Sequence, residues 1–218
     1  MTKKLGHLTK IFGLFLTITS LYSCVTYNLE KKLNTKLREW YSIHSILMQT
    51  RLPNGQIEAV YFLHLPENMQ IAYIRIFWKI RFTLLDQDKE FEARVGWANR
   101  IFGGEKAGKG YSTDRGQLFL LCGAPFQVSF FDSRGEEEGS IFTGSIELEP
   151  GTIMAWYYFY AGQFIGFYFE SDGMGGWRTS QNFRFPHSEN QAYFLAICQW
   201  ELAPTEEGWM LWQQEVTK

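Results

Sequence analysis

The sequence predicts an α+β fold in which N-terminal helices are followed by a mainly antiparallel β-sheet, with a possible further helix at the C-terminus. Up to residue 102, apolar residues recur at intervals of three and four, which is the period of an amphipathic helix. Beyond Gly110 they alternate or form short runs between turn residues, as strands do. Because 45% of the 218 residues are apolar and 17% are aromatic, the chain can bury a sizeable core.

The helical part is expected in segments that end at turn residues. The apolar spacing predicts helices over 28–49 and 88–102, and Gly103 with Gly104 ends the second of these. Between them, an apolar segment from Ile57 to Leu65 precedes Pro66, which suits the first turn of a helix running to about Arg81. That helix would place one apolar face on Ile71, Ile74, Phe77 and Trp78. The tail, 190–216, which contains Pro204, is predicted to be helical.

The sheet is expected to contain six strands, at 117–122, 126–132, 141–148, 153–160, 164–170 and 178–185. Ala161, Gly162 and Gln163 separate two aromatic runs and predict a hairpin turn. The acidic run Glu136–Glu138 is expected at a solvated hairpin tip. Calcium binding is the alternative, but consecutive glutamates do not form the alternating ligand ring of a calcium loop.

Residues 1–23 are expected to be a lipoprotein signal peptide. Three lysines without an acidic residue precede the apolar run Ile11–Tyr22, whose 12 residues suit a signal-peptide core better than a membrane span. Leu21 and Ser23 stand before Cys24 as in a bacterial lipobox, which predicts lipidation of Cys24. The alternatives are an ordinary signal peptide with an incidental cysteine and an uncleaved anchor. The expected location is the bacterial cell envelope, with the lipid anchor in the outer membrane, facing the periplasm or the cell surface.

The charge of the mature chain argues against a nucleic-acid partner. Removal of residues 1–23 takes away three lysines, which leaves 18 basic and 23 acidic residues and a net charge of −5. A nucleic-acid-binding domain needs a basic surface. Cys122 and Cys198 then remain as candidates for a disulfide, which export permits, and two buried free thiols are equally compatible with the sequence.

The segment Gly110–Gly116 reads Gly-Tyr-Ser-Thr-Asp-Arg-Gly and is the most distinctive stretch of the chain. Asp114 beside Arg115 could bind a polar ligand or act as a base. The favoured interpretation is structural: Thr113 and Asp114 bond the backbone N–H groups of a turn, Gly116 takes a positive φ, and the strand 117–122 follows.

Several aromatic, small and charged residues follow one another in a distinctive order: Phe77-Trp78, Arg94, Ala98-Asn99, Phe102, Gly110, Tyr111, Thr113, Asp114, Arg115, Gly116, Gly123-Ala124-Pro125, Trp156-Tyr157-Tyr158 and Phe164–Phe169. This order resembles that of the GWxTD-domain family of bacterial envelope proteins. The resemblance covers about residues 57–185; Tyr111 stands where the family name has Trp, and Cys122 and Ala124 also depart from the pattern.

The resemblance implies an exported protein, often a lipoprotein, whose domain has no established catalytic activity. It divides the chain into a signal peptide (1–23), an N-terminal helical segment (24–56), a GWxTD-like α+β domain (57–185) and a C-terminal extension (186–218). The implied partners are the membrane, through the anchor, and another envelope protein.

The sequence holds no recognisable catalytic, cofactor or metal motif. His44, His64 and His187 are scattered along the chain and do not have the spacing of metal ligands. His44 falls on an apolar helix face, which predicts a buried histidine and not a ligand.

Two other functions remain open. Asp114 with an unlocated partner would make an envelope hydrolase, and aromatic residues such as Trp156 and Tyr158 on a sheet face would make a carbohydrate-binding module. Core packing of those rings is the competing interpretation.

Overall fold

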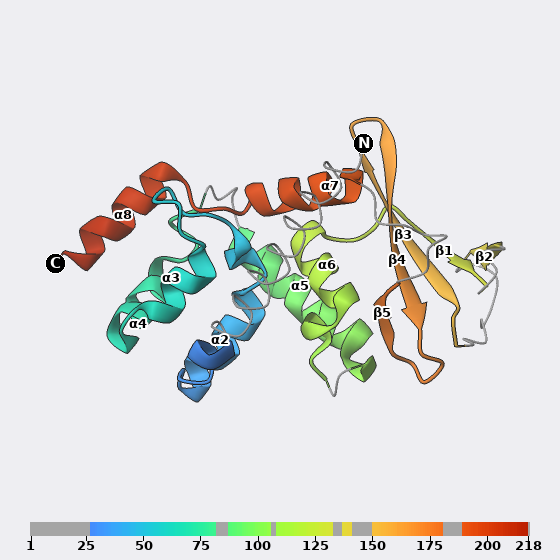
Figure 1. Ribbon diagram of the computed structural model, residues 1–218, viewed down its shortest axis with the longest axis horizontal. Coiled ribbons are helices and arrows are strands. Elements are labelled where there is room, and N and C mark those ends of the chain that lie inside the picture. Colours follow the sequence, from blue (N-terminus) through green and yellow to red (C-terminus); the bar gives the residue numbers. More distant parts are fainter. Residues whose placement is uncertain are drawn as a thin grey trace, which may run out of the picture.

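The computed structural model describes residues 27–81, 87–105, 108–132, 137–140, 150–180 and 189–217. The predicted signal peptide, Cys24, His187 and the predicted strand 141–148 lie outside these ranges. Within them the fold is α+β, as predicted, with helices on one side and an antiparallel sheet on the other (Figure 1). Seven α-helices are described: α2 (Thr35–His44), α3 (Glu58–His64), α4 (Glu67–Ile76), α5 (Gln87–Phe102), α6 (Asp114–Cys122), α7 (Glu189–Trp200) and α8 (Glu206–Val216).

The predicted helices 88–102 and 190–216 are confirmed, the second as α7 and α8 on either side of Pro204. The predicted helix 28–49 is interrupted, because the side chain of Asn34 accepts a hydrogen bond from the Leu37 N–H and starts α2 anew. After α2, residues Leu47–Gln49 form a short 3₁₀ turn. Pro66 is the residue that precedes α4, and the apolar segment before it is α3.

The predicted apolar face of α4 and the turn after it is confirmed in part: Phe77 is fully buried and Ile74 and Trp78 pack against the core. Ile71 is exposed, whereas Gln70 and Tyr73 are buried and continue the face to Phe77. Tyr73 contacts Trp212 of α8, with ring centroids 4.9 Å apart. The local pattern holds two overlapping apolar faces, and the position of α8 decides which one is covered.

The sheet has the strand order β2-β1-β3-β4-β5, with each neighbour antiparallel. Its strands are β1 (Gln127–Phe131), β2 (Glu137–Ser140), β3 (Ile153–Tyr160), β4 (Gln163–Ser171) and β5 (Trp177–Thr179). The predicted hairpin is confirmed: Tyr160 pairs with Gln163, and Ala161 and Gly162 take φ values of 48° and 81°. Glu137 pairs with Phe131, so part of the acidic run belongs to β2 and not to a hairpin tip.

The predicted strand 117–122 is wrong, because these residues belong to α6. The Thr113 hydroxyl accepts a hydrogen bond from the Gly116 N–H at 2.9 Å, which caps the helix, and Gly123 ends it with a φ of 77°. A run of four apolar residues fits a buried strand and a buried helix equally well. The capping threonine decides between them.

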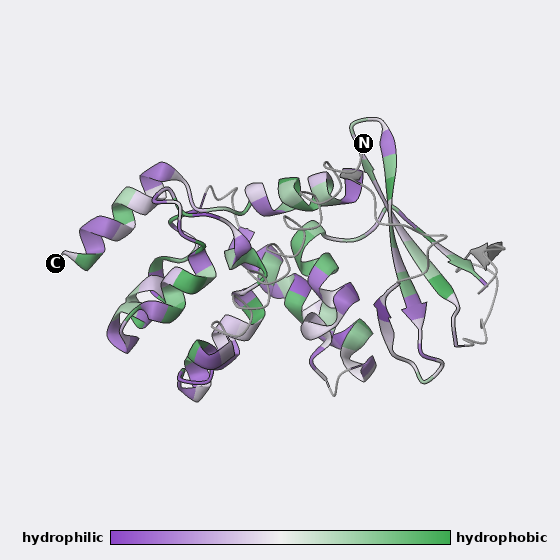
Figure 2. Ribbon diagram, in the orientation of Figure 1, coloured by the Kyte–Doolittle hydropathy of each residue, from purple (hydrophilic) through white to green (hydrophobic). Residues whose placement is uncertain are grey.

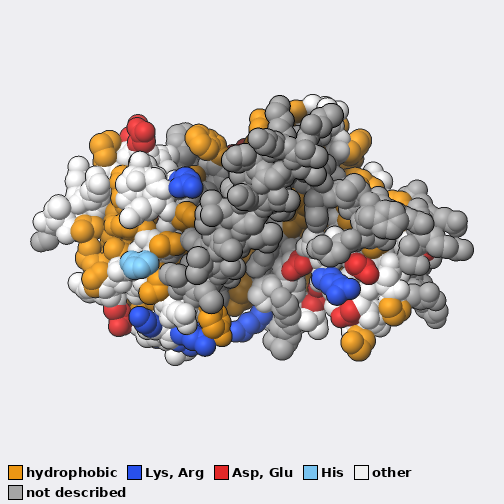
Figure 3. Space-filling model, in the orientation of Figure 1, with side chains coloured by type: hydrophobic (Ala, Val, Ile, Leu, Met, Phe, Trp, Pro, Cys, Tyr) orange, Lys and Arg blue, Asp and Glu red, His pale blue; other side chains and the backbone are white. Residues whose placement is uncertain are grey.

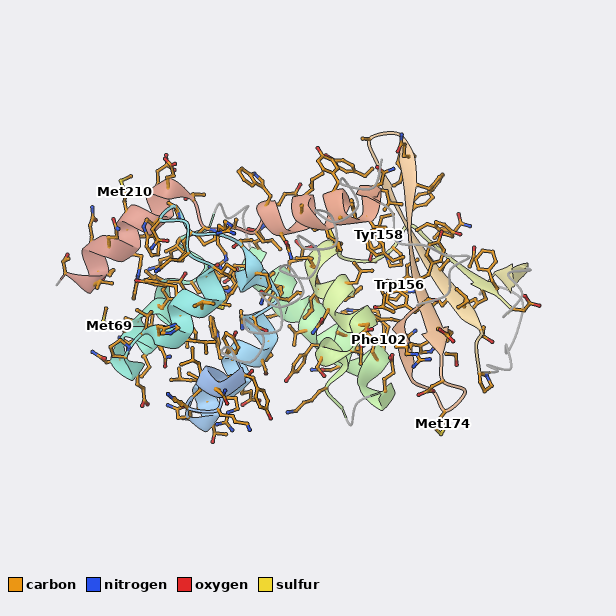
Figure 4. All side chains as sticks on the ribbon, in the orientation of Figure 1. Met69, Phe102, Trp156, Tyr158, Met174 and Met210 are labelled. Carbon is orange, nitrogen blue, oxygen red and sulfur yellow. A yellow bond between two sulfur atoms is a disulfide. The ribbon has the colours of Figure 1, made fainter. Side chains whose placement is uncertain are left out.

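A continuous core joins the sheet to the helices. Trp156 of β3 points toward Phe102 of α5, with ring centroids 5.7 Å apart (Figure 4). The β3–β4 hairpin, α6 and α7 are largely hydrophobic, whereas α2 and α8 carry long hydrophilic stretches (Figure 2). The C-terminal helix belongs to this core, since Trp212 is fully buried and the Thr205 N–H donates to the Ile80 carbonyl at 2.9 Å.

A disulfide joins Cys122 at the end of α6 to Cys198 in α7, with the two Cα atoms 5.4 Å apart. The sequence allowed either a disulfide or two buried free thiols, and the structure contains the disulfide. The bridge fixes α7 across the end of α6, next to the sheet. Gln191 of α7 also donates a hydrogen bond to the Gly166 carbonyl of β4.

Candidate functional site

The segment Gly110–Gly116 connects α5 to α6, and the structure places all six of its predicted motif residues at one junction between helices and sheet. Residues Gly110–Ser112 form a 3₁₀ turn, and Asp114 begins α6. We call this segment, together with Glu105 and Thr179, the motif junction.

Two glycines permit backbone-to-backbone packing at the motif junction. A Cβ atom on Gly110 would lie 1.9 Å from the Ala98 carbonyl oxygen of α5, and one on Gly116 would lie 1.9 Å from the Gly110 carbonyl oxygen. Gly116 has no positive φ, so that expectation is wrong. Glycine is needed there because no side chain fits between the two backbones.

Tyr111 and Thr113 hold the turn against the helices. The Tyr111 hydroxyl lies 3.2 Å from the Ser42 hydroxyl of α2, and its N–H donates to the Asn99 side chain at 3.4 Å. The Thr113 hydroxyl donates to the Gly110 carbonyl at 2.8 Å while it caps α6, and Thr113 is buried. These two side chains therefore use their polar atoms within the fold.

Asp114 bonds a strand that is distant in sequence. Its Oδ2 accepts hydrogen bonds from the Thr179 N–H at 2.7 Å and from the Thr179 hydroxyl at 2.8 Å. The carboxylate was expected to accept hydrogen bonds from backbone N–H groups of its own turn. That prediction is wrong, because the backbone N–H that it binds belongs to Thr179 of β5. Asp114 thereby ties the first turn of α6 to the edge of the sheet.

Arg115 is a buried cation between two rings. Its guanidinium lies over Phe102 and Trp177, 4.8 and 5.1 Å from their centroids, and it forms an ion pair with Glu105. Burial lowers the pKa of Arg115, and the hydrogen bond and charge of Glu105 oppose that change. The second carboxylate oxygen of Glu105 accepts from the Trp177 N–H at 3.3 Å, so Glu105 also reaches β5.

Glu105 and Thr179 are the members of the motif junction that sequence reasoning missed. Both partners come from outside the motif, one from the turn after α5 and one from β5. Glu105 lies in a glycine-rich loop and Thr179 is a single threonine, so neither belongs to a motif or a periodic pattern that would predict these contacts.

A second buried polar group lies among α3, α4 and the turn that follows α4. Glu58 pairs with Arg81 at 2.5 Å and accepts from the Tyr73 hydroxyl at 2.8 Å, and all three are buried. Burial and the charge of Glu58 raise the pKa of Tyr73, which stays a neutral donor. This group is closed to solvent and serves the packing of the helices.

The described histidines do not form a site. His44 is buried, and its Nδ1 lies 2.9 Å from the Trp40 carbonyl, so the ring donates there. Burial lowers the pKa of His44 to about 4, helped by Arg81 and opposed by the bond to Trp40. His64 is exposed on α3. In the part of the chain that the structure describes, no three His, Cys, Asp or Glu residues are grouped as metal ligands.

Trp156 and Tyr158 are buried, with 4% and 5% of their surface exposed, so neither presents a free ring face to a ligand. Tyr158 donates from its hydroxyl to the Gly123 carbonyl at 3.0 Å and lies toward α7 (Figure 4). Trp156 and Tyr158 therefore pack in the core and do not form a ligand-stacking surface. Successive side chains of a strand point to opposite faces of the sheet, and in β3 the even-numbered residues Trp156 and Tyr158 point to the helices.

Exposed rings occur in two places, at the β3–β4 hairpin with the start of β1, and on α7. Phe126, Phe159 and Phe164 are each more than half exposed and touch one another, with centroids 5.2 to 6.4 Å apart. On α7, Tyr193 is 63% exposed and Trp200 is 80% exposed. We call the three phenylalanines the aromatic surface; the hairpin turn and α7 lie along the same upper side of the molecule (Figure 1).

Two open grooves flank these features. One, of about 960 Å³, runs beside Trp200 and is lined by Leu52, Pro53, Ala196 and Pro204 among others. The other, of about 470 Å³, lies between α6, β4 and α7 and includes Asp114 at its wall. Both linings are mostly apolar.

Comparison with protein-family models, with curated proteins and with solved structures finds no match. Across residues 27–217, apart from the gaps given above, no helix has the length and apolar character needed to cross a bilayer. The contacts described above bind the chain to itself at the motif junction and leave aromatic rings open on the aromatic surface.

Proposed function

We propose that the protein is a lipid-anchored component of the bacterial cell envelope whose GWxTD-like domain binds another envelope protein and is not an enzyme. The single observation that carries this proposal is the aromatic surface. Phe126, Phe159 and Phe164 are exposed and in mutual contact, and aromatic side chains are enriched in protein interfaces. The partner would present an apolar, uncharged surface.

The absence of charge around the aromatic surface supports such a partner. No Asp, Glu, Lys or Arg occurs from Gly151 to Phe169 or from Asn190 to Trp200. The two segments are neighbours, since Phe194 of α7 packs on Tyr158 and Tyr160 of β3 with centroids 5.1 and 5.9 Å apart. Exposed apolar patches on a folded domain mark interaction sites.

The motif junction supports a structural role for the GWxTD-like residues. Asp114 directs one carboxylate oxygen to Thr179, and Arg115 is paired with Glu105 and enclosed by rings. A hydrolase would need a carboxylate held toward substrate beside a second acid or base. The lipid anchor rests on the sequence pattern at Cys24, which lies outside the described residues.

The proposal is tested by cross-linking the full chain in intact cells. The variant Phe159→Ser/Phe164→Ser changes the aromatic surface, and Trp97→Ser/Ile101→Ser changes two residues of α5 that are 50% and 52% exposed. We expect a specific adduct with one envelope protein that the first variant loses at least tenfold and the second keeps. Equal adducts in both variants, with equal melting temperatures, would count against the aromatic surface as the binding site.

A further inference from the structure

The first described residues form a basic segment close to the proposed lipid anchor. Residues 27–38 contain Lys31, Lys32, Lys36 and Arg38 against a single acidic residue, Glu30. Their net charge is +3, and since the chain from Cys24 onward carries −5, the remainder carries −5 − 3 = −8. An acidic protein thus has a segment of net positive charge at the start of its described residues.

The fold turns these cations outward. Leu33 and Leu37 are buried in the core, while Lys31, Lys32 and Lys36 are exposed on the other side of the same segment. Arg38 donates to the carbonyl oxygens of Lys31 and Leu33, which fixes the turn before α2. Lys and Arg side chains gather along the lower left edge of the molecule, near the start of α2 (Figure 3).

Acidic neighbours reduce this charge without cancelling it. Glu67 of α4 accepts a hydrogen bond from Asn34 at 2.6 Å, and Glu39 follows the segment on α2. In the described part of the chain, Lys31, Lys32 and Lys36 make no ion pair; Lys31 lies over the ring of Tyr27, 4.2 Å from its centroid. Tyr27 is itself 57% exposed.

From these positions we infer that the segment 27–38 lies on the anionic lipid headgroups of the membrane that holds the anchor. The inference rests on the proposed lipidation of Cys24. Tyr27 is the third residue after Cys24, and three residue steps span at most about 11 Å. The exposed lysines therefore lie within reach of the headgroups, where basic residues next to an anchor are attracted to anionic lipid.

The consequence is a fixed orientation of the domain. The start of α2 lies on the lower side of the molecule, whereas α7 and the turn of the β3–β4 hairpin lie on the upper side (Figure 1). With the basic segment on the bilayer, the aromatic surface faces away from the membrane, toward a partner. The lipid holds the protein, and the lysines set which face is presented.

Lysine footprinting on the full chain tests the inference. The protein is mixed with vesicles of phosphatidylglycerol and phosphatidylethanolamine, treated with a water-soluble acetylating reagent, and analysed by mass spectrometry. We expect Lys31, Lys32 and Lys36 to become at least threefold less reactive on these vesicles. Lys79 and Lys89, exposed on other parts of the chain, should stay unchanged. The protection should disappear in 1 M salt, where the Debye length is about 3 Å, and on phosphatidylcholine vesicles.

Two charge-matched variants sharpen the result. Lys31→Gln/Lys36→Gln should reduce the protection of Lys32 on the phosphatidylglycerol vesicles at least threefold, and Lys79→Gln/Lys89→Gln should leave it within 1.5-fold. Unprotected Lys31, Lys32 and Lys36 on a vesicle-bound chain would overturn the inference, as would a chain that never binds. The mass of the Cys24 peptide reports the anchor separately: protected lysines with an unmodified Cys24 would reject the lipidation and keep the lipid contact.

Discussion

The motif junction and the aromatic surface use their side chains in opposite ways. At the motif junction, Asp114, Arg115 and Thr113 direct polar groups to Thr179, Glu105 and the backbone. On the aromatic surface, Phe159 and Phe164 expose large rings for which the described chain supplies no cover. The most distinctive stretch of the sequence is thus architectural. The region best suited to bind a partner is an aromatic, uncharged segment that holds no candidate catalytic residue.

The largest expected effect comes from filling the space at Gly116. Gly116→Ala would force a methyl group against the Gly110 carbonyl oxygen, and we expect a loss of about 4 kcal/mol or more in the free energy of unfolding. Gly96→Ala in α5 is the control, because nothing lies within 4 Å of the added methyl. That change should be neutral or stabilising by up to about 1 kcal/mol. Denaturant unfolding measures both; equal stabilities would remove the close-packing role of Gly116.

Removing the disulfide tests how firmly the two regions are joined. The bridge closes a sequence separation of 76 residues between α6 and α7. Cys122→Ala/Cys198→Ala should therefore lose about 2–4 kcal/mol. A reducing agent should lower the melting temperature of the native chain and leave that of the double variant unchanged. If reduction has no effect on the native chain, α7 is held by packing alone.

A pH titration tests whether a buried polar group outside the motif junction is also structural. The folded pKa of His44 is about 4, below the ordinary value of 6.5, so the unfolded chain binds more protons between these values. The stabilising contribution is complete above pH 6.5 and is lost as the pH falls to about 4. The loss is up to about 3 kcal/mol.

His44→Gln should flatten this part of the pH profile, whereas His64→Gln, at an exposed position, should keep it. The measurement is the denaturation midpoint at half-unit steps from pH 4 to pH 7. A profile that is the same in both variants would mean that carboxylates, and not His44, set the acid limit.

Parts of this structure could be predicted and others could not, for reasons that particular residues make clear. The period of α5 and the residues of the β3–β4 turn are local signals, and both predictions are confirmed. The run Leu118–Leu121 is too short to distinguish a strand from a helix. The bond from Asp114 to Thr179 crosses 65 residues, so it depends on tertiary placement. The alternation of side chains along a strand likewise predicts that Tyr158 and Phe159 point to opposite faces of the sheet. It does not predict which face the helices cover.

Asp114→Ala separates a structural from a functional carboxylate. It leaves the Thr179 N–H and hydroxyl without their acceptor, so we expect a loss of about 1–3 kcal/mol. Glu92→Ala, an exposed position on α5, should change stability by less than about 0.5 kcal/mol. A thermal melt, paired with the cross-linking assay, measures both properties. An Asp114→Ala chain as stable as the native one yet inactive would assign the carboxylate to a ligand.

The smallest effect on stability should come from the aromatic surface. Phe159 and Phe164 are each 57% exposed, so Phe159→Ser/Phe164→Ser removes contacts made mainly among the exposed rings themselves. We expect the free energy of unfolding to change by about 1 kcal/mol or less, since exposed substitutions away from caps and buried groups have small effects. The cross-linked adduct should nevertheless be lost. This pattern is the reverse of that expected at the motif junction, where stability falls first. A double variant that unfolds as readily as Gly116→Ala would show that the rings belong to the core, and the contrast between the two regions would then fail.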